Sequence, residues 1–195
     1  MRRTVPSLLV AAVLAIAGCA TTPSAAPPTG HGDHAPVDDP KLKPAGDTGT
    51  PALGQPIMTM DELSLWVRDM TGECHDVAKA DDTALADYLG PTRVTWYGPF
   101  VAEWATCGIA PYDKLGLVLF GPGQQRALQE FWQRGLASGQ MADNPDWAFG
   151  NGFAVTAGPL GIDRLGLHYL TCEPTETSGE EHTVPADVEG CVYSR

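Results

Sequence analysis

The sequence predicts an α+β domain in which a duplicated helix-strand-strand unit gives a four-stranded antiparallel sheet, with helices on one face and disulfides as staples. Three observations support this prediction. Helical and strand-like segments alternate, a short pattern recurs fifty residues later, and four cysteines share the part of the chain that holds all fifteen aromatic residues. Because those aromatics extend from Trp66 to Tyr193, we expect a single globular domain over residues 56–195.

The first predicted helix opens with a capping box. The Thr59 hydroxyl and the Glu62 carboxylate can pair with free amides at the helix start, and Gly72 is a suitable end. Apolar side chains follow at helical spacing, namely Leu63, Trp66, Val67 and Met70. A short second helix is predicted over residues 83–89, with Asp82 as its cap and Gly90-Pro91 as its end.

The middle of the chain predicts two strands, a helix and two further strands. Bulky residues over 100–106 and a compact apolar run over 115–120 indicate the first two strands. Gly121-Pro122 opens a helix that continues to about residue 138. Residues 147–157 and 164–172 are then strand-like, and Asn151-Gly152 is either a tight turn or a bulge in one longer strand.

The duplication is inferred from a repeat. Asp113-Lys114-Leu115-Gly116-Leu117 returns as Asp163-Arg164-Leu165-Gly166-Leu167, and the upstream positions Thr106 and Gly108 match Thr156 and Gly158. A fixed period of this kind is typical of a repeated supersecondary unit, and chance similarity of two Leu/Gly-rich segments is the alternative.

The N-terminal region has the pattern of an export signal. Met1-Arg2-Arg3 is basic, and a mostly apolar run too short to span a bilayer follows it, so residues 1–18 are expected to be a signal peptide. Residues 20–55 contain no aromatic residue and are rich in Pro, Gly, Ala and Thr, which predicts a disordered tether.

The end of the apolar run, Ile16-Ala17-Gly18-Cys19, resembles the lipobox of bacterial lipoproteins. This resemblance implies that Cys19 receives a diacylglyceryl group and becomes the first mature residue. The protein would then lie on the extracytoplasmic face of the cell membrane, held by its acyl chains. The capped first helix, the Ala-Thr-Cys strand of residues 105–107, the second helix and the Trp/Gly strand of residues 147–158 resemble small lipoproteins of high-GC Gram-positive bacteria. The resemblance covers most of residues 59–172 and implies location and fold only.

The four remaining cysteines are predicted to form disulfides, because an even number in an exported chain is typical of a disulfide framework. Three pairings are possible. We favour Cys74 with Cys107 and Cys172 with Cys191, since the second bond would hold a polar tail against the last strand. A thiolate metal site is the alternative, but no C-x-x-C pair occurs.

Charge limits the partners. The formal net charge is −12 and becomes −14 when the two arginines of the signal peptide are removed, so nucleic acid is an unfavourable partner. Our leading hypothesis is a non-enzymatic binding module for an envelope protein or a cell-wall glycan, without a cofactor. Four aromatic residues are candidates for a sugar-stacking platform on an open sheet face, namely Trp96, Tyr97, Trp104 and Trp147.

Two other functions stay open. A cell-wall hydrolase could use Asp113, Asp163 and Glu103, provided that these carboxylates converge. Copper or zinc handling could use His31, Asp33 and His34 in the tether, where two imidazoles flank a carboxylate.

Overall fold

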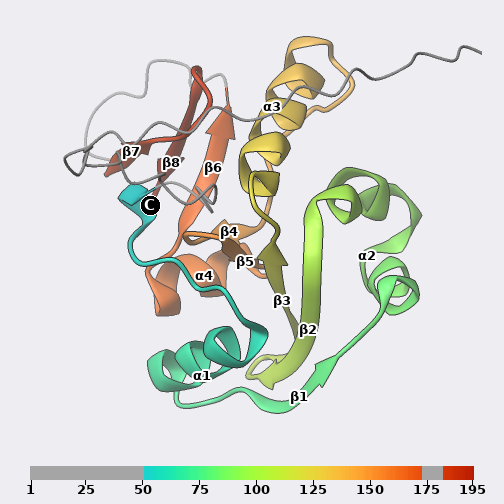
Figure 1. Cartoon of the computed structure of the whole chain (residues 1–195), viewed down its shortest axis with the longest axis vertical. Helices are drawn as coiled ribbons and strands as arrows, with labels where there is room; N and C mark the ends of the chain where they lie inside the picture. Colours follow the sequence, from blue (N-terminus) through green and yellow to red (C-terminus); the bar gives the residue numbers. More distant parts are fainter. Residues whose placement is uncertain (1–50, 173–181) are drawn as a thin grey trace, which may run out of the picture. The chain divides into compact units, whose positions relative to one another are not determined.

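The computed structural model describes residues 51–172 and 182–195 (Figure 1). Its α-helices are α1 (Met60–Thr71), α2 (Asp82–Tyr97), α3 (Gln124–Ala137) and α4 (Gly158–Leu165), and its short 3-10 helices are η1 (Pro51–Leu53) and η2 (Gly98–Phe100). Its strands are β1 (His75–Lys79), β2 (Val101–Ile109), β3 (Tyr112–Phe120), β4 (Ala148–Phe149), β5 (Phe153–Val155), β6 (His168–Cys172), β7 (Thr183–Pro185) and β8 (Cys191–Ser194).

The predicted capping box of α1 is confirmed. The amide of Glu62 donates to Thr59 Oγ1 at 3.2 Å, and the amide of Thr59 donates to Glu62 Oε2 at 3.2 Å. Gly72 ends the helix in the left-handed conformation, with φ 76°. Local sequence therefore determines both ends of this helix.

The second helix is longer than predicted. Asp81 rather than Asp82 caps α2, because the Asp81 carboxylate accepts from the amide of Ala84 at 3.0 Å. Gly90, with φ 79°, interrupts the helix, which then resumes at Pro91. The predicted break at Gly90-Pro91 is therefore present, but proline also fits the first turn of a helix, so a second helical stretch that the sequence analysis did not predict starts at Pro91.

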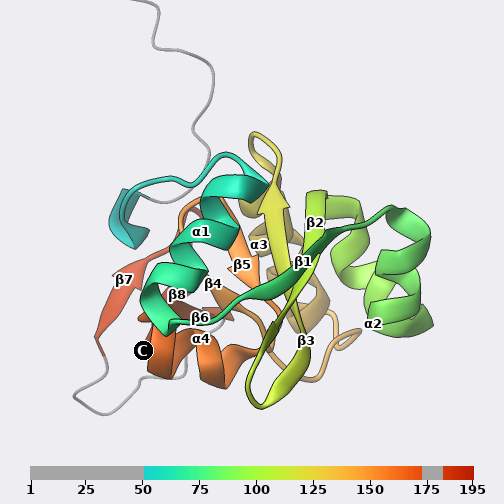
Figure 2. The same ribbon diagram turned by 90° about the horizontal axis from the view of Figure 1, so that it is seen from below.

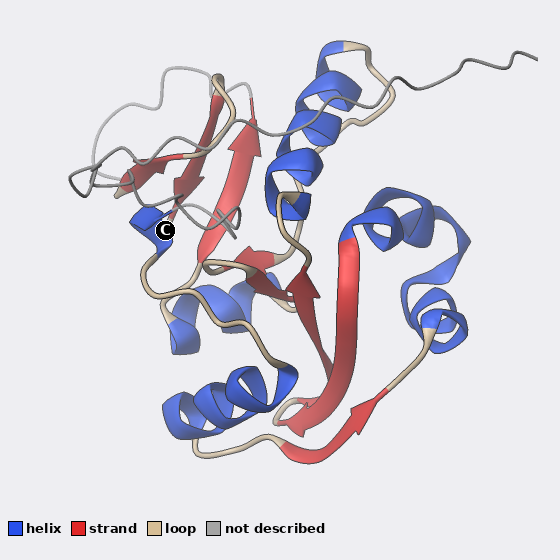
Figure 3. Ribbon diagram, in the orientation of Figure 1, coloured by secondary structure: helices blue, strands red, loops and turns tan. Residues whose placement is uncertain are grey.

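The sheet has eight strands rather than the predicted four, in the order β1-β2-β3-β5-β4-β6-β8-β7, and all neighbours are antiparallel (Figures 1 and 3). Asn151-Gly152 is the tight turn of the β4–β5 hairpin, closed by the Gly150 amide donating to the Phe153 carbonyl at 2.9 Å. The edge strands β1 and β7 are short and largely exposed, with five and three residues respectively.

Helices cover both faces of the sheet, so the prediction of helices on one face is also wrong (Figures 1 and 2). Alternate side chains of β3 belong to two separate cores. Leu117 packs in the core with α1 and α4, whereas Val118 packs in the core with α2 and α3. Successive side chains of a strand point to opposite faces, and a strand buried on both faces reads as the continuous apolar run seen in β3.

The structure does not contain the predicted duplication. Asp113–Leu117 lies in β3, whereas residues 163–165 end α4 and Gly166 caps that helix with φ 64°. The same letters therefore adopt two conformations. The strand predicted over 164–172 consists of the end of α4 and the shorter strand β6.

Both favoured disulfides are present. Cys74–Cys107 joins the segment before β1 to β2, with 5.1 Å between the Cα atoms. Cys172–Cys191 joins β6 to β8 at directly opposed positions, 4.0 Å apart. The second bond holds the C-terminal segment on the sheet, as expected.

Within residues 51–172 and 182–195, no helix combines the length and apolar character needed to cross a bilayer.

Candidate ligand pocket

The second half of α2 brings three side chains to one face. Arg93, Trp96 and Tyr97 have the i, i+3, i+4 spacing that aligns residues along a helix. They face Trp132 of α3 and the loop that follows α3, and together these segments enclose a pocket of about 390 Å3. The loop contributes Gln140, Met141, Ala142, Asp143, Asn144 and Asp146. A volume of about 300–1,000 Å3 is typical of small-molecule sites.

The wall of the pocket is aromatic. The Tyr97 ring stacks on Trp147 with 3.8 Å between ring centres, and it also contacts Trp132 at 4.9 Å. Trp96 meets Trp132 edge-on at 6.2 Å. Tyr97 and Trp132 are 2% exposed, whereas Trp96 is only half-buried. Trp96 therefore offers an accessible ring against a rigid aromatic support.

The polar side of the pocket is centred on Asp146. Its Oδ1 accepts from Arg93 Nη2 at 2.8 Å and from the Tyr97 hydroxyl at 3.0 Å, and the Arg93 guanidinium lies 5.5 Å from the centre of the Tyr97 ring. Burial of Tyr97, together with the neighbouring Asp146 carboxylate, raises the pKa of the phenol well above its ordinary value. Tyr97 therefore stays protonated and fixes the position of Asp146.

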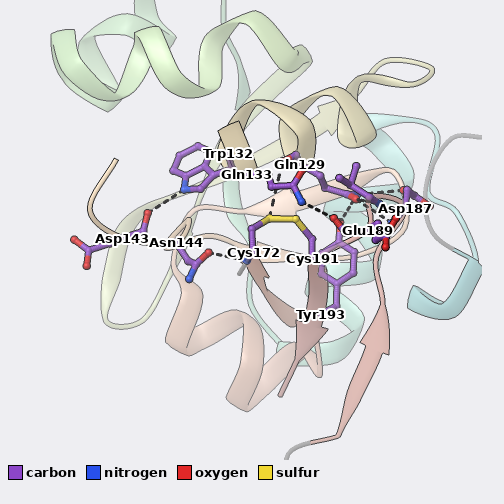
Figure 4. Close-up of a disulfide and its surroundings, with 11 residues drawn as sticks. Gln129, Trp132, Gln133, Asp143, Asn144, Cys172, Asp187, Glu189, Cys191 and Tyr193 are labelled. Carbon is purple, nitrogen blue, oxygen red and sulfur yellow. Dashed lines mark hydrogen bonds between the residues drawn. A yellow bond between two sulfur atoms is a disulfide. The ribbon is translucent and has the colours of Figure 1, made fainter. Parts of the chain in front are cut away.

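The loop that forms the rim is fixed at three points. The Met141 amide donates to the Gly135 carbonyl at 3.1 Å, and Trp132 Nε1 donates to the Asp143 carbonyl at 3.0 Å. Asn144 Oδ1 accepts from the amide of Cys172 at 2.8 Å, which connects the rim to the Cys172–Cys191 disulfide (Figure 4). The pocket is therefore built into the fold, and a ligand would not have to order the loop.

The four aromatic candidates separate into three positions. Trp96 and Tyr97 line the pocket, and Trp147 supports Tyr97 from behind. Trp104 lies elsewhere, donating its indole N–H to the Asp81 carbonyl at 2.9 Å and contacting Tyr88. The expected open sheet face is absent from the described residues, because helices cover both faces.

The three carboxylates of the hydrolase hypothesis come from different places. Glu103 lines a pocket with Lys79 and Trp104, whereas Asp113 lines a second pocket with Glu73, His75 and Asp76. Asp163 is exposed on α4. Glu103 and Asp113 therefore line different pockets.

The predicted metal-binding residues of the tether lie outside the residues that the structure describes. Cys19, His31, Asp33 and His34 are outside the described residues. Among the residues that are described, no group of three or more His, Cys, Asp or Glu side chains could hold a metal ion.

Sequence reasoning missed Arg93, Trp132, Asp146 and Asn144 as pocket residues. Trp132 is a buried residue of α3, 2% exposed. Aromatic and polar residues are frequent over 93–97 and 140–147, and this composition could have indicated the pocket. The two segments form a site only because a helical stretch follows Gly90.

The chain matches no protein-family model, no curated protein and no solved structure.

Proposed function

We propose that the protein is a lipid-anchored binding module of the bacterial cell envelope, displayed on the extracytoplasmic face of the membrane, and that its pocket holds a cell-wall saccharide. The pocket bounded by Trp96, Tyr97 and Trp132 is the observation that carries the binding function. The lipobox-like Cys19 carries the location.

A saccharide fits the composition of this pocket. One face of a pyranose ring presents C–H groups that pack against an aromatic side chain, and its hydroxyls need hydrogen-bonding partners around the edge. The half-buried Trp96 ring supplies the apolar contact. Gln140, Asn144 and Asp146 supply donors and acceptors on the rim. Two disulfides are consistent with an oxidising compartment outside the cytoplasm.

The binding function is tested by calorimetric titration of the folded domain with β-1,4-linked N-acetylglucosamine oligomers and with soluble cell-wall fragments. We expect saturable binding that Trp96→Ala weakens about tenfold, because a stacking contact is lost. Tyr112→Ala is the matched control, since Tyr112 is an exposed aromatic residue outside the pocket. The absence of binding, or binding that is unaffected by Trp96→Ala, would remove the pocket as the site.

The location is tested separately by mass spectrometry of the full chain purified from bacterial membranes. We expect an N-terminal Cys19 carrying acyl chains, and a Cys19→Ala variant that leaves the membrane fraction. An unmodified Cys19, or an uncut N-terminus, would contradict the anchor without affecting the binding test.

A further inference from the structure

Three basic residues lie side by side where β6, β8 and β7 meet at one end of the sheet. Ser194 of β8 is opposite Tyr169 in β6 and Thr183 in β7 (Figure 1). In an antiparallel sheet, the next position along β8 faces the preceding position in each neighbouring strand. This register aligns a basic row that consists of His168, Arg195 and His182.

The basic row lines one pocket. The residues two positions away on the three strands, Leu170, Tyr193 and Val184, pack in the core with α3. Because alternate residues of a strand share a face, the basic row lies on this same face of the sheet. All three basic residues line a pocket of about 450 Å3, together with residues of η1, of β7 and the Gly166 cap of α4.

Arg195 is held in position and keeps free donors. Its Nη1 donates to the Gly166 carbonyl at 3.1 Å. Within the described residues, its Nε and Nη2 and the imidazoles of His168 and His182 make no hydrogen bond. The basic row therefore offers several N–H donors to a ligand in the pocket.

The pocket of the basic row also differs in charge from the other pockets. No described Asp or Glu lines it, whereas carboxylates line the pockets that contain Asp146, Glu103 and Asp113. No ion pair joins the basic row to a described side-chain carboxylate or to the backbone carboxylate of Arg195. In a chain with a formal net charge of −12, this pocket is a local site that attracts anions.

Repulsion within the basic row favours an anionic ligand. Burial, and then the Arg195 charge, lower the pKa of His168. Like charges directly opposite one another in a sheet are destabilising. The residues of η1 and Gly166 bring no titratable side chain to the pocket that could offset this repulsion. An anion bound among the three side chains would remove it and would favour the protonated imidazoles.

We propose that the basic row binds a terminal phosphate group, either as inorganic phosphate or as a monoester of a small molecule. One guanidinium and two imidazolium groups can pair with the three free oxygens of such a group. A phosphodiester, as in a lipid headgroup, has only two free oxygens and one charge, so it would leave one cation unpaired. The site is separate from the saccharide pocket and does not depend on it.

The test titrates the full chain in detergent with inorganic phosphate and, separately, with dimethyl phosphate. Binding is followed through the backbone amide NMR signals of β6 and β8, at pH 7.5 and at pH 5.5 and at constant ionic strength. The variants are Arg195→Gln and the double variant His168→Gln/His182→Gln. Arg68→Gln and His75→Gln are the matched controls, because both residues are exposed and lie outside the pocket.

We expect wild type to bind phosphate at least about threefold more tightly at pH 5.5 than at pH 7.5, because imidazoles ionise in this range. Phosphate itself becomes less negative as the pH falls, so this gain would come from the protein. The double histidine variant should lose the gain, and Arg195→Gln should weaken binding about threefold at both pH values. Both controls should bind as wild type does, and dimethyl phosphate should bind more weakly than phosphate.

Three results would overturn the proposal. The first is the absence of saturable shifts in β6 and β8, and the second is a pH-dependent gain that persists in the double histidine variant. The third is an equal loss of affinity in Arg68→Gln and Arg195→Gln, which would attribute binding to general charge. If dimethyl phosphate binds as tightly as phosphate, the assignment to a terminal phosphate is wrong and a diester such as a lipid headgroup is the ligand.

Discussion

Asn144 accepts a hydrogen bond from the backbone amide of Cys172, so the rim of the ligand pocket rests on a disulfide-bonded strand. The link joins two parts of the chain that are 28 residues apart. Because Asn144 lines the pocket and Cys172 lies in β6, the shape of the pocket depends on the position of β6 relative to α3.

Replacing Asn144 with alanine should destabilise the protein. The change leaves the Cys172 amide without its acceptor, and an unsatisfied, largely buried amide costs about 1–3 kcal/mol in the free energy of unfolding. Urea denaturation measures this cost. Gln140→Ala removes another rim side chain that makes no hydrogen bond within the described residues, so it should change stability by less than about 0.5 kcal/mol. Equal effects of the two variants would contradict the role given to Asn144.

The two disulfides should differ in their effect on the pocket. Replacing both cysteines of Cys172–Cys191 with alanine should lower the free energy of unfolding by about 3 kcal/mol, since this bond closes a sequence separation of 19 residues. The same change at Cys74–Cys107 should cost about 0.5 kcal/mol more, because its separation is 33 residues. Only loss of Cys172–Cys191 should also weaken ligand binding, since only this bond lies next to Asn144. Urea unfolding and ligand titration of both double variants provide the measurements. An equal loss of affinity in the two variants would contradict this coupling.

Gln129 should be essential to stability although it is polar. It is 0% exposed, its Oε1 accepts from the amides of Asp187 and Val188 at 2.9 and 3.2 Å, and its Nε2 donates to Tyr193 and Asp187 (Figure 4). Gln129→Leu keeps the volume and removes all four bonds, so we expect a loss of at least about 2 kcal/mol in the free energy of unfolding.

Arg126→Ala on the same helix is the control for Gln129. It removes an exposed ion pair with Glu130 and should cost about 0.3–0.5 kcal/mol. Thermal or urea unfolding compares the two variants directly. A Gln129→Leu variant as stable as Arg126→Ala would show that the buried network contributes nothing.

Acidification should destabilise the protein through His168. Burial, and the neighbouring positive charge of Arg195, lower the pKa of His168 below its ordinary value of 6.5. The folded state therefore favours the neutral imidazole. This contribution is present above pH 6.5 and is lost as the pH falls through the lower folded-state pKa, because the unfolded chain then binds more protons.

His168→Gln removes this titration. Between about pH 7.5 and pH 5.5, the variant should lose less stability than wild type, as measured by urea unfolding at each pH. His182, an exposed histidine that lines the same pocket as His168 and Arg195, provides the matched control variant His182→Gln. Parallel losses in wild type and His168→Gln would contradict the assignment.

Local sequence signals predicted local structure well. The capping box of α1, the length of α3 and both disulfide pairings are confirmed, and of the two alternatives at Asn151-Gly152 the structure has the tight turn. The caps, the helix and the turn depend on residues that are close in sequence. The disulfide prediction required only a choice among three possible pairings. The number of strands could not be obtained in this way, because β1 and β7 are short, largely exposed edge strands, β8 has four residues, and the strand predicted over 147–157 is the β4–β5 hairpin.

The repeat misled the prediction for a physical reason. Gly116 is in the middle of β3, where Thr156 packs against it, whereas Gly166 is a left-handed helix cap. Glycine suits both roles, so matching letters did not mean matching structure. The pocket was missed for a related reason: it requires α2 to continue beyond Gly90-Pro91, and a proline after a glycine indicates a stop as readily as a restart.

The five tryptophans allow the most direct test of the saccharide pocket, through the indole N–H signals of a 15N-labelled domain titrated with an N-acetylglucosamine oligomer. Trp96 and Trp132 line the pocket and Trp147 supports it, whereas Trp66 and Trp104 pack elsewhere. We predict concentration-dependent shifts for Trp96 and Trp132, a smaller shift for Trp147, and no change for Trp66 and Trp104. Unmoved signals for Trp96 and Trp132, or shifts centred on Trp66 or Trp104, would contradict the proposed site.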